Sequence, residues 1–178
     1  MIVPAMHQKN SEKSYGDYLL NNKNCVFCYD VNDSEDCKYL NVGVNCKDLL
    51  DCNNMYLNPQ RSYETLGTIG TYNVHWCLYV FNSSDVYYSQ LCYDCNHCFG
   101  CIGLRQKEYC IFNTQYTKEK RETKVQELMD YMVQTGEYGS FRATRYAVHP
   151  YNDSLAHEYF PLYAVVSSTG EKTIVNEQ

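Results

Sequence analysis

The apolar and polar positions between residues 72 and 113 repeat with a period of eleven residues. Each unit combines a short apolar segment with a polar position, such as Asp85, Asn96 or Lys107, that is typical of an exposed turn. A unit this short cannot bury its apolar face alone, so the pattern predicts that the units stack into a parallel β-solenoid. The aligned columns are Trp76, Tyr87, Cys98 and Tyr109; Cys77, Tyr88, Phe99 and Cys110; and Val80, Leu91 and Ile102.

A second array with the same period covers residues 22–54. Its turns begin with small polar residues, which form turns through their own side-chain hydrogen bonds. The two arrays are out of phase, because Leu50 and Cys77 are twenty-seven residues apart, five more than two units. We therefore expect a solenoid over residues 22–113 with an insertion near residues 55–72, preceded by an N-terminal edge or cap segment at residues 1–21. The aligned columns here are Val26, Cys37 and Asp48, and Cys28, Tyr39 and Leu50.

The period changes after residue 113 to one that is typical of a helix. Thr117 is a suitable N-cap and Gly136 a suitable terminator, so residues 114–136 are predicted to contain a capping helix at 118–134. Its apolar stripe is expected to cover the exposed last rung of the solenoid. The stripe is Val125, Leu128, Met129 and Met132, and the polar face is Lys118, Glu119, Lys120, Arg121, Glu122, Lys124 and Glu127.

Residues 137–178 are rich in aromatic side chains and interrupted by Pro150 and Pro161. Such a composition predicts an irregular tail that wraps onto the core, with one possible strand at 172–175. The fold class expected from the whole chain is mainly β: a parallel β-solenoid of 11-residue repeats, capped by one C-terminal amphipathic α-helix and an aromatic tail.

The composition indicates which residues fill the core and which partners are disfavoured. The 19 Tyr and 11 Cys residues supply much of the apolar content in place of Leu and Ile. Tyr can bury its ring while its hydroxyl finds a polar partner, which suits a narrow stack. A net charge of -6 with scattered Lys and Arg argues against nucleic acid. The sequence shows neither a secretion signal nor an apolar run of membrane-spanning length, so we expect a cytoplasmic protein without a membrane partner.

Four cysteines at a uniform spacing of three are the sharpest local motif: Cys92, Cys95, Cys98 and Cys101, with His97 between them. Paired Cys-x-x-Cys knuckles are typical of zinc sites, and four nearby cysteines also occur in iron–sulfur proteins. The third interpretation is that these thiols are small core residues of the repeat. A zinc site would require the backbone to leave strand geometry, because residues three apart on an extended strand point to opposite faces.

Catalytic interpretations are less favoured. A nucleophilic thiol needs a nearby histidine, and with 11 Cys and five His residues a chance pairing is common. We therefore expect a non-catalytic scaffold or protein-interaction module, with a protein partner or self-association through an edge of the solenoid. The alternative is a thiolate protein that binds Zn through Cys92, Cys95, Cys98 and Cys101.

Six runs of the sequence together carry a resemblance to a known family: residues 16–25, 98–104, 107–119, 135–139, 151–154 and 158–162. They resemble an uncharacterised Cys- and Tyr-rich family that is frequent in candidate phyla radiation bacteria. The resemblance spans most of residues 16–162 and implies no activity. Members of that family often carry further segments that resemble zinc ribbons, outside the matching runs.

Overall fold

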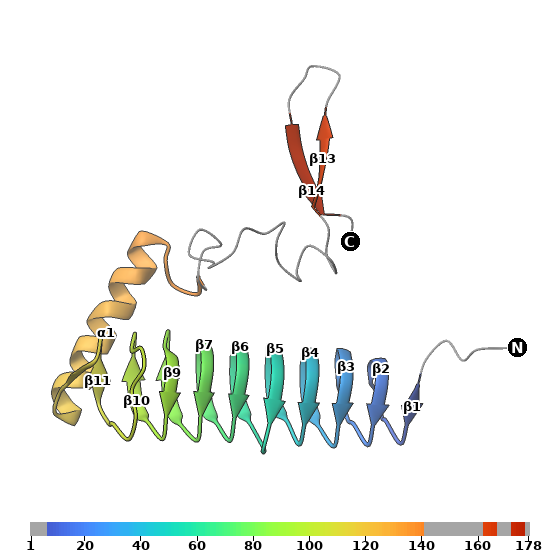
Figure 1. Cartoon of the computed structure of the whole chain (residues 1–178), viewed down its shortest axis with the longest axis horizontal. Coiled ribbons are helices and arrows are strands. Elements are labelled where there is room, and N and C mark those ends of the chain that lie inside the picture. The colour runs from blue at the N-terminus through green and yellow to red at the C-terminus, as the bar shows by residue number, and fades with distance from the viewer. Residues whose placement is uncertain (1–6, 141–161, 167–171, 177–178) are drawn as a thin grey trace, which may run out of the picture. The chain divides into compact units, whose positions relative to one another are not determined.

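The chain forms a parallel β-solenoid followed by one helix (Figure 1). The computed structural model describes residues 7–140, 162–166 and 172–176. It consists of two compact units, residues 1–141 and 142–178. The strands of the solenoid are β1 (Gln8–Lys9), β2 (Tyr15–Leu20), β3 (Val26–Asn32), β4 (Glu35–Val44), β5 (Lys47–Tyr56), β6 (Gln60–Ile69), β7 (Tyr72–Phe81), β8 (Ser84–Tyr87), β9 (Gln90–Tyr93), β10 (Asn96–Phe99), β11 (Cys110–Ile111) and β12 (Thr114–Gln115).

The parallel solenoid is confirmed, but the period of eleven is wrong. Each coil takes twelve residues, as the pairing of Glu35 with Lys47 and of Tyr72 with Ser84 shows. Gln8 pairs with Leu19, so the first coil has the predicted offset of eleven residues. A period of eleven aligned the inward residues Cys77 and Cys110 with the outward residues Tyr88 and Phe99, because Cys, Tyr and Phe all count as apolar in the sequence pattern.

The predicted insertion near residues 55–72 is also wrong. β6 is an ordinary member of the stack, paired on one side with β5 and on the other with β7. The only irregularity between β5 and β6 is one extra residue, because Lys47 pairs with Gln60. Leu57 and Asn58, both with positive φ, stand at this bulge.

Inside each coil the chain bends every three residues. A residue with positive φ stands before most inward-facing residues; Asp33, Asp36 and Tyr39 have φ values of 52°, 55° and 53° and precede buried positions. This left-handed conformation is tolerated best by Asn and Asp, which hold many of the bends. The bends turn every third side chain into the solenoid, so the alternation of an extended strand does not apply.

The inward side chains form two apolar clusters separated by one polar coil. The separating coil carries Ser62, Thr65, Thr68 and Thr71, all buried. Every cysteine of the chain is free and buried in one of the two clusters. The first cluster is Leu19, Cys25, Cys28, Val31, Cys37, Leu40, Cys46, Leu49, Cys52 and Met55, and the second is Val74, Cys77, Val80, Val86, Cys92, Cys95, Cys98, Cys101 and Cys110.

The N-terminal segment is part of the solenoid. β1 and β2 pair in parallel with each other, and β2 continues the stack onto β3. Of the two predicted roles, edge or cap, residues 7–21 therefore form the edge of the stack and not a separate cap, and residues 1–6 lie outside the described residues.

At the C-terminal end the last coil turns back on itself and leads into a helix. β12 pairs antiparallel with β11, and α1 (Lys118–Thr135) follows. The predicted helix at 118–134 is confirmed, and its caps are as expected. The Thr117 hydroxyl accepts a hydrogen bond from the Lys120 amide, and Gly136 adopts the left-handed conformation with φ 74°.

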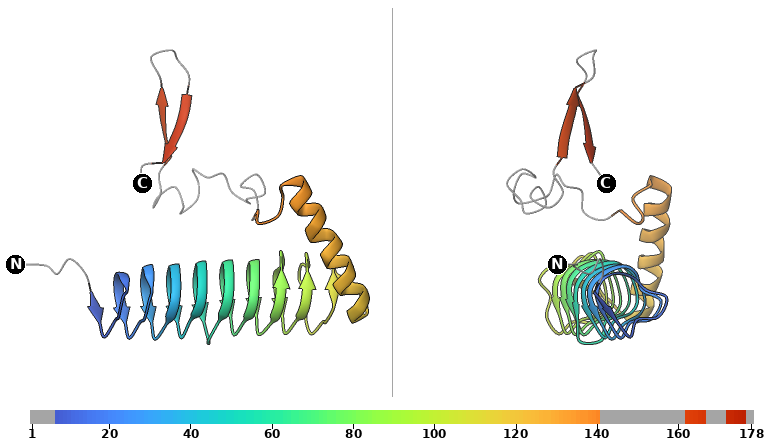
Figure 2. Two further views of the ribbon diagram at one scale, coloured as in Figure 1. Left: turned by 180° about the vertical axis from the view of Figure 1, so that it is seen from behind. Right: turned by 90° about the vertical axis from the view of Figure 1, so that its right-hand side faces the viewer.

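The helix packs on outward-facing side chains of the last coils (Figure 2). Val125 is buried with Phe99 and Ile111, and the remaining stripe residues pack around them. Arg121 was expected on the polar face, but it is buried and extends this stripe by one turn. The helix is not long and apolar enough to span a membrane, nor is any other helix in the described part of the chain.

The beginning of the tail also contacts the solenoid. The Tyr138 ring lies edge-on against Trp76 at 5.4 Å between centroids, and the Gly139 amide donates to the Tyr88 hydroxyl at 2.9 Å. The rest of the wrapping segment, residues 141–161, lies outside the described residues. In the second unit the predicted strand at 172–175 is confirmed as β14 (Lys172–Asn176), antiparallel to a strand that was not predicted, β13 (Leu162–Val166).

Candidate functional site

The four cysteines of the predicted metal site occupy the inward positions of one coil. All four side chains are fully buried. Each thiol donates to the carbonyl two residues before it, at distances of 3.2–3.5 Å. A residue with positive φ stands before each cysteine, so the backbone leaves extended strand geometry and turns all four thiols inward.

The coil does not have the arrangement of a metal centre. No group of three or more His, Cys, Asp or Glu within the described residues is placed so that it could hold a metal ion. One coil earlier, small residues that cannot ligate as thiolates occupy the same positions: Val80, Ser83, Val86 and Ser89. The thiols therefore fit the role of small core residues, and neither the zinc nor the iron–sulfur interpretation fits the geometry.

The described histidines do not activate a thiol. His75 and His97 point outward and stack on Tyr87 and Tyr109, at 5.3 Å and 5.1 Å between centroids. Burial lowers the pKa of His75, which disfavours its protonated form. Because the thiols point inward and these rings point outward, they cannot form the Cys–His pair that nucleophilic catalysis needs.

The same arrangement of three thiols occurs near each end of the solenoid. Cys25, Cys28 and Cys37 have the spacing i, i+3 and i+12, and so have Cys98, Cys101 and Cys110. In each set two thiols are neighbours within one coil, and the third follows in the next coil. Sequence reasoning missed this relation because it depends on the twelve-residue coil.

Within each set, the interaction between neighbouring thiols separates their pKa values. The interaction with Cys28 lowers the pKa of Cys25, while the pKa of Cys28 is raised. The interaction with Cys98 likewise lowers the pKa of Cys101 to about 7, and the pKa of Cys98 is raised. Each pair therefore loses its first proton readily and its second with difficulty.

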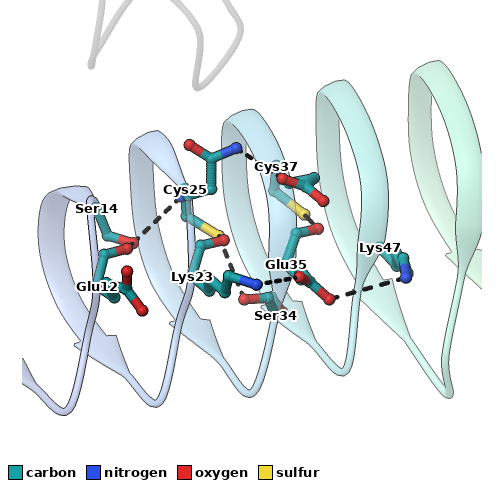
Figure 3. Close-up of polar contacts among 10 residues, drawn as sticks. Glu12, Ser14, Lys23, Cys25, Ser34, Glu35, Cys37 and Lys47 are labelled. Atoms are coloured by element: carbon teal, nitrogen blue, oxygen red, sulfur yellow. Dashed lines mark hydrogen bonds and ion pairs between the residues drawn. The ribbon is translucent and has the colours of Figure 1, made fainter.

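The outer surface carries ladders of polar side chains, which join neighbouring coils. Lys23 and Lys47 flank Glu35 at 3.0 Å and 3.8 Å (Figure 3). Asn24 donates to Asp36 at 2.6 Å. These groups are exposed, so each ion pair contributes little to stability.

Rows of aromatic rings run along other sides of the solenoid. Rings one coil apart stack almost parallel, and their outer members are exposed, as with Phe27 and Tyr39. Towards the C-terminus the row that continues from these residues is covered by α1 and Tyr138. The stacked pairs include Phe27 with Tyr39, His75 with Tyr87, Trp76 with Tyr88, Phe81 with Tyr93, and His97 with Tyr109.

The N-terminal end has a hollow of about 450 Å³ and two exposed rings. Tyr15 and Tyr18 are 68% and 58% exposed. The Asp17 carboxylate accepts hydrogen bonds from the His7 and Tyr18 amides, and the first of these lowers its pKa most. The hollow is lined by His7, Gln8, Lys9, Tyr18, Leu19, Leu20, Asp30 and Asn32.

Comparison with known proteins identifies no family. No family model matches the chain, and no curated protein matches it. A hexapeptide transferase family protein from Anaplasma phagocytophilum is similar at 12% identity and a TM-score of 0.16, over 66% of this chain and 80% of that one. A similarity at this TM-score carries no argument. The resemblance to the Cys- and Tyr-rich family is not tested by these comparisons and stays a prediction.

Proposed function

We propose that this protein is a non-catalytic β-solenoid scaffold that binds a second copy of its own chain through the N-terminal edge. The observation that carries this proposal is the difference between the two ends. Among the described residues, the first half of β2, residues 15–17, pairs with β3 and with no strand on its other side. At the other end, β11 pairs with β12 and is covered by α1. An open strand edge is a ready template for another chain.

The side chains at this end suit such a contact. Tyr15 and Tyr18 offer large exposed rings on β2, Tyr18 also lines the hollow, and aromatic residues are enriched in protein interfaces. A two-fold axis through the end would place the same surface on both copies, so one edge can pair with its own counterpart.

The proposal includes a cytoplasmic location and no nucleic-acid or membrane partner. Eleven buried free cysteines fit a reducing compartment, where disulfides are rare. The net charge of -6 disfavours binding to phosphate groups. Zinc binding is left out of the proposal, because the lining of the cysteine coil does not fit a metal centre.

Light scattering of the purified full chain over a range of concentrations tests the proposal. The mass should rise from one chain to two as the concentration increases. A Tyr15→Lys, Tyr18→Lys variant should stay monomeric at concentrations where the parent is a dimer, because each interface would then bring positive charges together.

Tyr79→Lys is the matched control. Tyr79 is also an exposed ring, but it lies on β7, away from both ends. This variant should dimerise like the parent. A parent that is monomeric at all concentrations, or dimerisation lost in Tyr79→Lys and kept in the edge variant, would overturn the proposal.

A further inference from the structure

One row of corner positions is covered towards the C-terminal end of the solenoid and exposed towards the N-terminal end. Its members stand at the same bend of successive coils, as the pairing of the strands shows, and all have positive φ. They are Phe27, Tyr39, Asp51, Glu64, Trp76 and Tyr88. The row therefore has a pair of aromatic residues on each side of two carboxylates.

The covered pair shows which side chains bind at this corner. The Trp76 and Tyr88 rings stack at 4.6 Å between centroids, and the Tyr138 ring lies edge-on against Trp76 at 5.4 Å. The Gly139 amide donates to the Tyr88 hydroxyl at 2.9 Å. In this arrangement Trp76 is only 6% exposed. A segment with an aromatic residue followed by glycine therefore fits a stacked pair of rings at this corner.

The second pair has the same form and is open to solvent. The Phe27 and Tyr39 rings stack at 5.4 Å between centroids, with their planes 4° apart. They are 49% and 46% exposed, and no ring of the described residues lies across them as Tyr138 lies across Trp76. Tyr39 carries a hydroxyl at the position where Tyr88 accepts its hydrogen bond. The exposed pair therefore repeats the binding surface of the covered pair.

Beyond Tyr39 the row continues into an acidic hollow of about 410 Å³. Neither Asp51 nor Glu64 forms an ion pair with another described residue. Lys38 lies over the Tyr39 ring, with its Nζ 5.0 Å from the ring centroid, so a positive charge on a partner is favoured at the carboxylates and not at the rings. The hollow is lined by Asp51, Asn53, Glu64, Thr65 and Leu66.

We propose that Phe27, Tyr39, Asp51 and Glu64 bind an extended segment of a partner protein that carries an aromatic residue, a glycine and then a basic residue. The aromatic side chain lies against the Phe27 and Tyr39 rings, the glycine amide donates to the Tyr39 hydroxyl, and the basic side chain enters the acidic hollow. Coils stack about 4.8 Å apart and an extended chain rises about 3.3 Å per residue, so the basic residue stands about two residues after the glycine. This surface lies along the side of the stack and does not depend on dimerisation.

Peptide titrations followed by nuclear magnetic resonance of the isotope-labelled full chain test the proposal. The probe is the synthetic peptide acetyl-Tyr-Gly-Ser-Arg-amide. Its addition should shift the amide signals of Phe27, Tyr39 and Glu64. A matched peptide with Glu in place of Arg should bind about fivefold more weakly, because it brings a negative charge to the hollow. High salt should weaken binding of the Arg peptide and narrow this difference.

Variants of exposed rings separate this surface from general stickiness. Tyr39→Asn removes the ring and its hydroxyl and keeps a residue that tolerates the left-handed conformation, so it should stay folded and bind the Arg peptide about tenfold more weakly. Tyr79→Asn is the matched control and should bind like the parent. Tyr79 is 45% exposed and has a φ of 52°, against 53° at Tyr39, but lies in another row. An Asp51→Asn, Glu64→Gln variant should bind the Arg and Glu peptides about equally.

The proposal fails on any of four results. The first is that the Arg peptide shifts none of the signals of this row at millimolar concentration. The second is that Tyr79→Asn weakens binding as much as Tyr39→Asn, and the third is that the parent binds the two peptides equally at low salt. The fourth is that the signals of Phe27 and Tyr39 shift with protein concentration alone, which would show that a second copy covers the row. The mass of the chain is measured separately, so the test of dimerisation at the N-terminal edge stands or falls independently.

Discussion

The coil at residues 60–71 and the coil at residues 90–101 have the same backbone path and opposite linings. The first carries four hydroxyl side chains inward and the second carries four thiols, and all eight are buried. Two of the hydroxyls reach back to sulfur atoms of the preceding coil, while Ser62 donates to the Gln60 carbonyl of its own coil. Thr68 donates to Met55 at 2.9 Å, and Thr65 donates to Cys52 at 3.3 Å. The thiols donate to carbonyls of their own coil instead.

The two linings show which side chains the inward positions of this solenoid accept. The inward side chains of the two apolar clusters are aliphatic chains and thiols, without an aromatic ring. The polarity of an inward side chain is free to vary as long as each polar atom finds a local partner. Thr71 is the exception in the hydroxyl coil, since its Oγ1 has no hydrogen-bond partner among the described residues.

The largest effect is expected from Met55→Ala, at the boundary between the first apolar cluster and the hydroxyl coil. Met55 is fully buried, and its sulfur accepts from Thr68, so the change leaves a cavity and an unpaired hydroxyl. Unfolding by urea should show a loss of about 2–5 kcal/mol. Cys92→Ala, further along the same column, is the matched control and should lose clearly less. Equal losses would mean that the two coils are packed alike.

An opposite effect is expected at Thr71. Thr71→Val removes a buried hydroxyl without a partner and keeps the shape, so it should stabilise the protein by about 1 kcal/mol. Thr68→Val removes a hydroxyl that is bonded to Met55 and should give no such gain. Thermal unfolding of the two variants side by side measures the difference. A lower melting temperature for Thr71→Val than for Thr68→Val contradicts the assignment.

A smaller effect is expected when the thiol coil is made more like the hydroxyl coil. Cys95→Ser should cost less than about 1 kcal/mol, because Ser83 occupies the same position one coil earlier and also donates to the carbonyl two residues before it. Elemental analysis of the parent belongs to the same test. Stoichiometric zinc in the parent, lost together with much of the stability in the variant, would restore the metal interpretation.

The smallest effect is a pH dependence that the hydroxyl coil cannot have. The pKa of Cys101 is lowered from its ordinary value of 9.0 to about 7, mainly by the interaction with Cys98. A group whose pKa is lower in the folded state stabilises the fold above its unfolded pKa and loses this contribution as the pH falls. Cys101→Ser should therefore gain less stability between pH 7 and pH 9 than the parent does. Cys95→Ser is the control, and an unchanged slope in Cys101→Ser would show that Cys101 is not ionised.

The fold class and the helix follow from local patterns in the sequence. Short repeated apolar segments cannot be stable unless they stack, which predicted the solenoid. Thr117, Gly136 and the stripe around Val125 predicted the helix because capping and amphipathic spacing act within a few residues. The sequence also contains a signal for the position of the bends. Asn or Asp recurs every three residues, as at Asp30, Asp33 and Asp36, and marks the bends.

The length of a coil and the direction of each side chain depend on contacts between coils. The register between coils is set by backbone pairing across twelve residues, and a shift of one residue would place outward side chains at inward positions. For the same reason, the cysteines predicted to ligate a metal became the lining of one coil. Arg121, assigned to solvent by its charge, is buried because α1 lies against Phe99 and Ile111. Local patterns encode conformation, whereas the neighbours of a side chain are set by which coil stacks on which.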